Sequence, residues 1–227
     1  MKPRYNSFLV VAIIFAVLAT GGVGHAANIL NITGPAPFGF ANQIVMVEAW
    51  SQPATYSNVS ITMPLMDGSL DGPIAGVEGT VYLMNQIGPG TTSANEVAPP
   101  VTISGLTGTF APRMLFSGLT LPPGTYYVVL SSTNSDNLSM SAAGTGASTV
   151  TVGTGVSSLG TGAESIAAPY PPATSMALSV PGNLLIDVTG DLVSTAVGVP
   201  VLDTVGVAVL MLCLAGASIY ALRRRRT

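Results

Sequence analysis

Short runs in which apolar and polar residues alternate dominate the middle of the chain. The alternation is clearest over residues 59–65, 81–84 and 126–131, and a longer run covers residues 40–50. Residues two apart share one face of a strand, so each run predicts a β-strand. Within the longer run, Met46 and Trp50 fall on one face, with Val45, Val47 and Ala49 on the other. Shorter candidate strands are residues 114–117, 149–152, 176–180 and 184–188.

The runs are separated by turn-forming residues, of which Asp67-Gly68 and Pro122-Pro123-Gly124 are examples. No amphipathic helical stripe of ten or more residues stands out between residues 28 and 198. The pattern therefore predicts an all-β fold, an antiparallel β-sandwich of jelly-roll type, formed by one domain over residues 27–192. The Gly/Ser/Thr-rich residues 141–165 could form a linker, but apolar strand signals resume after them, so we expect a loop and an edge strand.

The N-terminus has the features of an export signal. Lys2 and Arg4 precede an apolar run of 12 residues, Phe8–Ala19, which is too short to span a membrane comfortably. Small residues then flank His25, which predicts a signal peptide over residues 1–26 with cleavage after Ala26. Cleavage after Ala27 and an uncleaved N-terminal anchor are the alternatives.

The C-terminus carries a second apolar segment. The 19 residues from Thr204 to Leu222 contain no charge, and Arg223, Arg224, Arg225 and Arg226 follow them. A helix of this length extends roughly 28 Å, enough to cross a hydrocarbon core. The arginine cluster predicts a stop-transfer signal on the cytoplasmic side. Residues 193–198 are then a short linker, and the domain lies outside the cytoplasm.

The predicted exported region is acidic. All ten acidic residues lie between Glu48 and Asp203, whereas Arg113 is its one basic residue, so its net charge is −9. Such a surface repels nucleic acid, which we exclude as a partner.

The exported region also lacks histidine, lysine and cysteine, because His25 lies in the signal peptide and Cys213 in the apolar tail. This composition excludes Ser-His-Asp and Cys-His nucleophiles and metal sites built on His or Cys. We therefore predict a non-enzymatic protein with no cofactor. A carboxylate-pair glycan hydrolase is the remaining catalytic class. Its candidate carboxylates are Glu48, Glu78, Glu96 and Glu164.

Two further ligand sites are compatible with the sequence of the predicted domain. Asp67 and Asp71, each followed by glycine, resemble half of a calcium loop, although a turn explains these residues equally well. Trp50, Tyr126 and Tyr127 could form a sugar-stacking platform, and core packing is the alternative. Tyr126 and Tyr127 are neighbours in a strand, so we expect one in the core and the other partly exposed.

The tail resembles a known class of bacterial sorting signal. Its short motif, one apolar helix and terminal arginine cluster are similar to the PEP-CTERM class, and more closely to the IPTL-CTERM signals. Val199, Pro200, Leu202 and Gly206 occupy the motif positions. Residues 121–132, 168–172 and 182–185 also resemble domains that precede such tails. The resemblance implies a Gram-negative envelope protein, sorted by an exosortase-like membrane peptidase, with no common catalytic activity.

Two functions from different classes follow from these observations. The first is a structural or adhesive protein of the envelope or exopolysaccharide, either anchored by one membrane span or released to the cell surface after processing. The second is a carbohydrate-binding module or lectin, with or without the assistance of calcium.

Overall fold

The computed structural model describes residues 26–34, 38–39, 44–67, 76–132 and 141–193, which belong to one compact unit ending at Val193. The predicted sorting tail and almost all of the predicted signal peptide lie outside the described residues. Within the described ranges, no helix is both long and apolar enough to cross a membrane.

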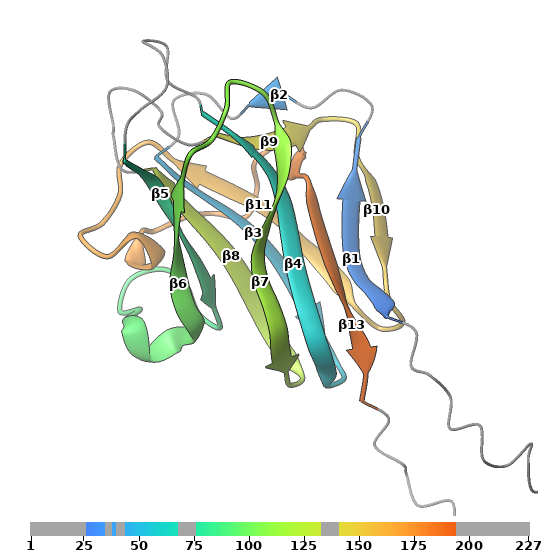
Figure 1. The fold of residues 1–227 in the computed structure, drawn as a ribbon. Helices are drawn as coiled ribbons and strands as arrows, with labels where there is room; N and C mark the ends of the chain where they lie inside the picture. The colour runs from blue at the N-terminus through green and yellow to red at the C-terminus, as the bar shows by residue number, and fades with distance from the viewer. Residues whose placement is uncertain (1–25, 35–37, 40–43, 68–75, 133–140, 194–227) are drawn as a thin grey trace, which may run out of the picture. The chain divides into compact units, whose positions relative to one another are not determined.

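The described residues form thirteen strands and two short 3-10 helices (Figure 1). In chain order these elements are β1 (Ala27–Thr33), β2 (Phe38–Gly39), β3 (Val45–Gln52), β4 (Tyr56–Met66), β5 (Val77–Met84), η1 (Ser93–Asn95), β6 (Glu96–Ser104), β7 (Ala111–Leu121), β8 (Gly124–Ser132), β9 (Ser141–Thr145), β10 (Thr149–Val152), β11 (Ser157–Glu164), η2 (Pro171–Ala173), β12 (Asn183–Leu184) and β13 (Ile186–Leu192).

The strands form two antiparallel sheets, which confirms the predicted β-sandwich. The large sheet has the order β10-β1-β13-β4-β9-β12, with β7 paired to β4 and β2 paired to β9. The small sheet has the order β11-β3-β8-β5-β6. The large sheet is in front and the small sheet behind in Figure 1.

The period-two pattern of the sequence decides which side chains enter the core. In β4, Val59, Ile61 and Met63 are 0% exposed and lie between the sheets. Thr62 and Pro64 alternate with them and line the outer surface of the large sheet. The alternation over residues 59–65 therefore describes a half-buried strand, as predicted.

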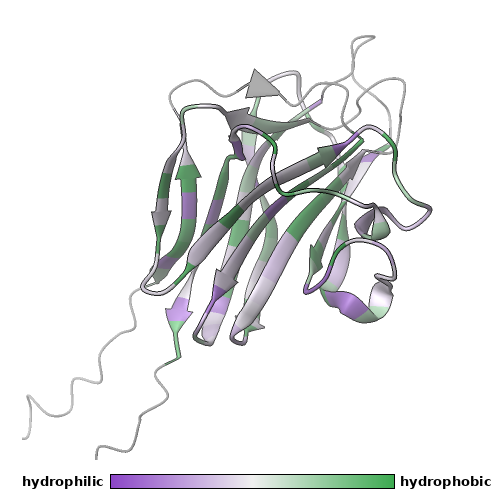
Figure 2. Ribbon diagram, turned by 180° about the vertical axis from the view of Figure 1, so that it is seen from behind, coloured by the Kyte–Doolittle hydropathy of each residue, from purple (hydrophilic) through white to green (hydrophobic). Residues whose placement is uncertain are grey.

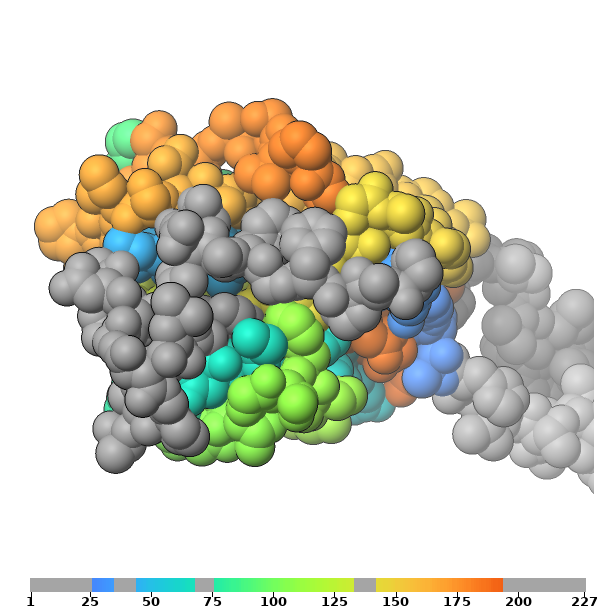
Figure 3. Space-filling view, turned by 90° about the horizontal axis from the view of Figure 1, so that it is seen from above, coloured from blue at the N-terminus to red at the C-terminus, as the bar shows by residue number. Residues whose placement is uncertain are grey.

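The strand β3 differs because both of its faces are buried. Met46 and Trp50 belong to the main core, as predicted for one face. Val45 and Val47 belong to a second apolar cluster on the outer face of the small sheet. A segment over residues 166–180, which we call the strap, covers this cluster. Figure 2 shows the strap crossing in front of the small sheet, and Figure 3 shows it in orange as an outer layer.

Backbone hydrogen bonds hold the strap in place. Gly88 N–H donates to Pro172 O at 2.9 Å, and Val180 N–H donates to Thr161 O at 3.1 Å. Residues 176–180 were predicted to form a strand, but they are irregular. Their apolar side chains, including Met176 and Leu178, pack onto the outer face of the small sheet. The alternation is present, but the segment lies over the sheet instead of within it.

The first and last long strands of the unit are neighbours. β1 and β13 run antiparallel, and Ala27 lies opposite Gly190. The start of β1 and the end of β13 therefore lie side by side at one end of the sandwich (Figure 1).

Candidate functional site

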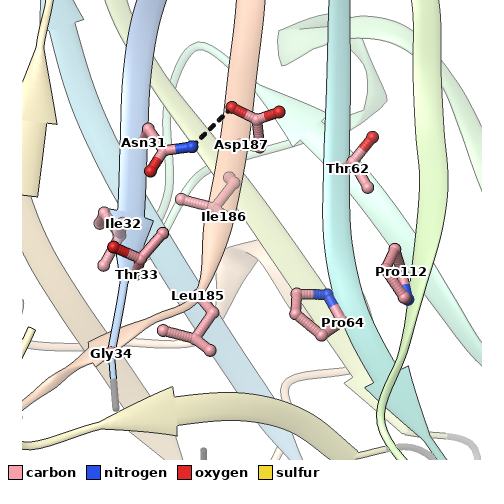
Figure 4. Close-up of a pocket in the computed structure, with 10 residues that line it drawn as sticks. All are labelled: Asn31, Ile32, Thr33, Gly34, Thr62, Pro64, Pro112, Leu185, Ile186 and Asp187. Carbon is pink, nitrogen blue, oxygen red and sulfur yellow. Dashed lines mark hydrogen bonds between the residues drawn. The ribbon is translucent and has the colours of Figure 1, made fainter.

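A hollow of about 340 Å³ opens on the outer face of the large sheet (Figure 4). Four strands contribute to it, namely β1, β13, β4 and β7. It is lined by Asn31, Ile32, Thr33, Gly34, Thr62, Pro64, Pro112, Leu185, Ile186 and Asp187. These residues come from separate parts of the chain, so only the folded sheet brings them together.

The hollow lies where β4 changes its neighbour. β4 pairs with β13 up to Thr62 and with β9 from Leu65. Pro64 stands between the two pairings, where its missing N–H costs no ladder hydrogen bond. The chain passes from β12 to β13 at Leu185, whose N–H donates to Ala143 O of β9 at 2.8 Å. The break in the ladder therefore leaves a depression in the sheet surface.

Polar side chains converge on one side of the hollow. Asn31 of β1 donates from Nδ2 to Asp187 Oδ1 of β13 at 2.9 Å. The second oxygen of Asp187 points toward the Thr62 side of the hollow (Figure 4). Asp187 is exposed, whereas Asn31 and Thr62 are half-buried. The pair thus offers a carboxylate oxygen and an amide oxygen as acceptors for a ligand with hydroxyl donors.

The other side of the hollow is apolar. Pro64 of β4 lies opposite Pro112 of β7, and Leu185 is half-buried beside them. The two rings are rigid and have no hydrogen-bond donor, so they present carbon to a ligand. The hollow therefore suits a molecule that has both hydroxyl groups and an apolar face.

The aromatic platform predicted from Trp50, Tyr126 and Tyr127 is not formed. Trp50 is 0% exposed, its ring centroid lies 5.5 Å from that of Tyr126, and its Nε1–H donates to Gln52 Oε1 at 3.1 Å. Tyr126 is 5% exposed, so both rings are core residues, because the inner face of the small sheet buries them. Tyr127 is half-buried and packs against the cluster on the opposite face, which confirms the predicted division of the two tyrosines.

Glu48 is a carboxylate enclosed within the sandwich. It lies on the same face of β3 as Met46 and Trp50 and is 0% exposed. Its Oε2 accepts from Thr161 Oγ1 of β11 and from Leu184 N–H of β12, the latter at 3.2 Å. Its Oε1 has no hydrogen-bond partner among the described residues. Burial raises the pKa of Glu48 to about 7, and the hydrogen bonds that lower it, chiefly those from Thr161 and Leu184, offset only part of that effect.

The other candidate carboxylates of a hydrolase have separate partners. Glu78 is 1% exposed and accepts from Leu106 N–H at 2.9 Å. Glu96 accepts from the Tyr170 hydroxyl at 2.7 Å, and Glu164 is half-buried at the end of β11. The bond to Glu96 is a secondary cause, after burial, of a raised pKa of Tyr170. Glu48 and Glu78 are thus buried and inaccessible to a substrate.

The calcium prediction rested on Asp67 and Asp71. Asp67 is 5% exposed, and its backbone N–H donates to Thr107 O at 2.9 Å. Asp71 lies outside the described residues. In the part of the chain that the structure describes, no three His, Cys, Asp or Glu residues are grouped as a metal site requires. The sorting motif at Val199–Gly206 and the Arg223–Arg226 cluster also lie outside the described residues.

Sequence reasoning missed the residues that line the hollow. Thr62 and Asp187 lie within two predicted strands, residues 59–65 and 184–188, but nothing in the sequence marked either as a ligand-binding residue. Asn31 lies in β1, which was not predicted, because a register shift between Asn28 and Leu30 disrupts its alternation. Polar residues in the outward positions of a strand are normal for a solvated face, so no local signal marked these three as one group.

Comparison with known proteins gave one structural likeness. No family model matches the chain, and no curated protein matches it. A solved structure described as Xyl-CBM35 in complex with a glucuronic acid containing disaccharide is similar at 18% sequence identity and a TM-score of 0.34. The likeness covers 60% of this chain and 86% of that one. At this TM-score it supports no conclusion about the site.

Proposed function

We propose that this protein is a non-enzymatic, exported binding protein of the bacterial envelope, which adheres to polysaccharide through the hollow on the large sheet. The observation that carries the proposal is the Asn31–Asp187 pair, held across β1 and β13 and facing an apolar wall of Pro64 and Pro112. Sugars combine hydroxyl groups with apolar C–H faces, and the hollow offers a counterpart for each. This role combines the adhesive and carbohydrate-binding hypotheses.

The burial of the acidic side chains supports a binding role over a hydrolytic one. A glycosidase needs two accessible carboxyl groups that flank the scissile bond. Glu48 and Glu78 are enclosed, and Glu96 accepts a hydrogen bond from Tyr170. The exported region has no histidine, lysine or cysteine to supply another nucleophile or base.

The strand pairings support the finer description of the fold as a jelly roll. In a jelly roll the chain folds back on itself as a long double ribbon that is shared between two sheets. Within each sheet, strands from early in the chain therefore pair with strands from late in the chain. Here β1 pairs with β13, β3 with β8, β4 with β7 and β5 with β6. The segment from β9 to β12 then adds β10 to one edge of the large sheet and β11 to one edge of the small sheet.

Export and sorting complete the proposal and rest on the sequence. The signal peptide, the apolar segment 204–222 and the arginine cluster would deliver the domain outside the cytoplasm. An exosortase-like peptidase would then read the motif at Val199–Gly206. Cell fractionation with intact-mass measurement separates the outcomes: loss of the mass after about Pro200 indicates processing, whereas a full-length membrane form indicates a plain anchor. Replacing the four arginines with neutral residues should abolish retention in both cases, and unchanged localisation would contradict their role.

Retention of the full chain, purified in detergent, on immobilised polysaccharides tests the binding function. A panel should include mixed-linkage glucan, xylan, galactomannan, alginate and polygalacturonate. We expect retention on at least one polymer, weakened about tenfold or more in Asp187→Ala, because a hydrogen bond to a charged group is lost. Retention on none of the polymers would contradict the proposal.

The chain offers a matched control for that variant. Asp191 lies on the same strand and accepts from Asn58 Nδ2 at 2.7 Å, so it forms a second Asn–Asp pair away from the hollow. Asp191→Ala should leave retention within about twofold, because it removes an equal charge without touching the hollow. An equal loss in both variants would indicate a general charge effect instead of a site.

A further inference from the structure

The hollow is the middle of a longer row of outward-facing side chains. Register places Thr151 opposite Asn31, Asn31 opposite Asp187, Asp187 opposite Thr62, and Thr62 opposite Met114. Directly opposed residues of an antiparallel pair point to the same side of the sheet. These five residues, which we call the cross-strand row, therefore traverse β10, β1, β13, β4 and β7 on one surface.

The row is long and open at both of its ends. Neighbouring strands lie about 4.8 Å apart, so four spacings span about 19 Å, comparable to about four sugar units of an extended chain. Thr151 is exposed at one end, and Met114 is 65% exposed at the other. A ligand that fills the hollow can thus continue across the sheet in both directions. A blind pocket would instead select the end of a chain.

The charge of the row selects the class of polymer. Asp187 is its one charged member, and the other four side chains are neutral. Arg113 is the sole cation within the described ranges, and its guanidinium donates to Gly105 O at 2.6 Å. A polymer that carries carboxylates would meet Asp187 without a matching cation, whereas neutral hydroxyl groups can donate to its carboxylate.

We propose that the cross-strand row binds the interior of an extended, neutral polysaccharide chain that lies across the strands. Asn31 and Asp187 hold the central sugar, Thr62 lies beside it, and Thr151 and Met114 contact the units on either side. The inference rests on the proposed function and adds the class of ligand and its direction on the sheet.

The test uses fragments of whichever neutral polymer of the panel retains the full chain. Fragments of two to eight units should be measured by calorimetry. We expect the dissociation constant to fall from the dimer to about four or five units and then to level, because the row spans about four strand spacings. Fragments whose two terminal sugars are chemically blocked should bind as tightly as unmodified fragments, because the row contacts the interior of the chain.

Variants at the ends of the row separate this inference from the proposed function. Thr151→Ala and Met114→Ala should weaken long fragments about three- to tenfold and leave dimers unchanged, since each removes one peripheral contact. The matched control is Thr120→Ala, which changes an exposed threonine of β7 outside the row. It should leave the affinity for long fragments and for dimers unchanged. Full affinity at the dimer, loss of binding on end-blocking, or retention on acidic polymers alone would overturn this inference while the proposed function stands. Retention on no polymer would overturn both.

Discussion

The two sheets of the sandwich present outer faces of opposite character. On the small sheet, Val45, Val47 and Val129 are 0% exposed beneath the strap. On the large sheet, Thr62, Asp187 and Met114 face outward, and Met114 is 65% exposed. Both faces belong to antiparallel sheets that share one core, so sheet geometry alone does not explain the difference.

The strap explains the difference. An antiparallel sheet can leave one face solvated, but β3 carries valines on its outer face that need a cover. Gly162 lets the strap approach closely, because a Cβ there would lie 2.9 Å from Val47 Cγ1 and 3.0 Å from Ala177 O. The strap thus covers the outer face of β3 and β8, whereas the outer face of the large sheet stays open for binding.

The largest expected effect comes from placing a charge on the covered face. Val47→Asp would bury an unpaired carboxylate under the strap and should lower the free energy of unfolding by about 3–5 kcal/mol. Thr151→Asp, the same residue introduced on the open face, should cost less than about 1 kcal/mol. Urea denaturation of the full chain measures both. Equal losses would show that the strap does not exclude water.

The titration of Glu48 reports how well the interior between the two sheets excludes water, and so allows a comparison with the covered face. A pKa of about 7, against the ordinary 4.5, means that the folded state keeps a proton that the unfolded state releases. Its contribution to stability is therefore fully present below about pH 4.5 and is lost as the pH rises through about 7. The loss amounts to about 3 kcal/mol at about 1.4 kcal/mol per pKa unit.

Glu48→Gln isolates that contribution, since glutamine has the same shape and does not titrate. The free energy of unfolding of the unmodified chain, minus that of the variant, should fall by about 3 kcal/mol between pH 4 and pH 8. Taking the difference cancels the titration of the other acids. A difference that stays constant with pH would mean that Glu48 is solvated in the folded protein.

The smallest effect concerns the attachment of the strap. Tyr170→Phe removes the hydroxyl that donates to Glu96 Oε1 at 2.7 Å. It keeps the ring, which packs edge-on against Tyr82 with 5.7 Å between the ring centroids. We expect a loss of about 1 kcal/mol in the free energy of unfolding. Hydrogen exchange should show faster opening in the strap than in the large sheet. Uniform loosening of both sheets would mean that the strap and the sheets open together.

The strands that could be predicted from the sequence are those whose alternation is uninterrupted. Residues 59–65 and 126–131 lie within β4 and β8. β6 was missed because Pro99 and Pro100 interrupt it, and both are exposed on a strand at the end of the small sheet, where proline is tolerated. Residues 141–165 were expected to hold a loop and an edge strand, and they contain the edge strands β10 and β11. The position of β11 was not predicted, because small residues such as Gly160 and Gly162 replace its apolar positions and leave no period-two signal.

The residues of the candidate site could not be predicted from such local patterns. Trp50 and Tyr126 are the residues that composition marks for sugar binding, but both lie on the inner face of the small sheet. Asn31, Thr62 and Asp187 are ordinary outward residues of three strands that are far apart in sequence. Their meeting depends on the register of β1, β13 and β4, which no local pattern specifies.

The sequence by itself determined the all-β class, the core faces of the regular strands and the lack of histidine, lysine and cysteine between residues 26 and 193, because periodicity and composition are local properties of the chain. Only the tertiary structure decided which outer face is covered, that Glu48 is enclosed and that a hollow opens beside Pro64. Each of these depends on which strands become neighbours and on where the strap crosses them. Those are long-range pairings, fixed by packing over the whole sandwich.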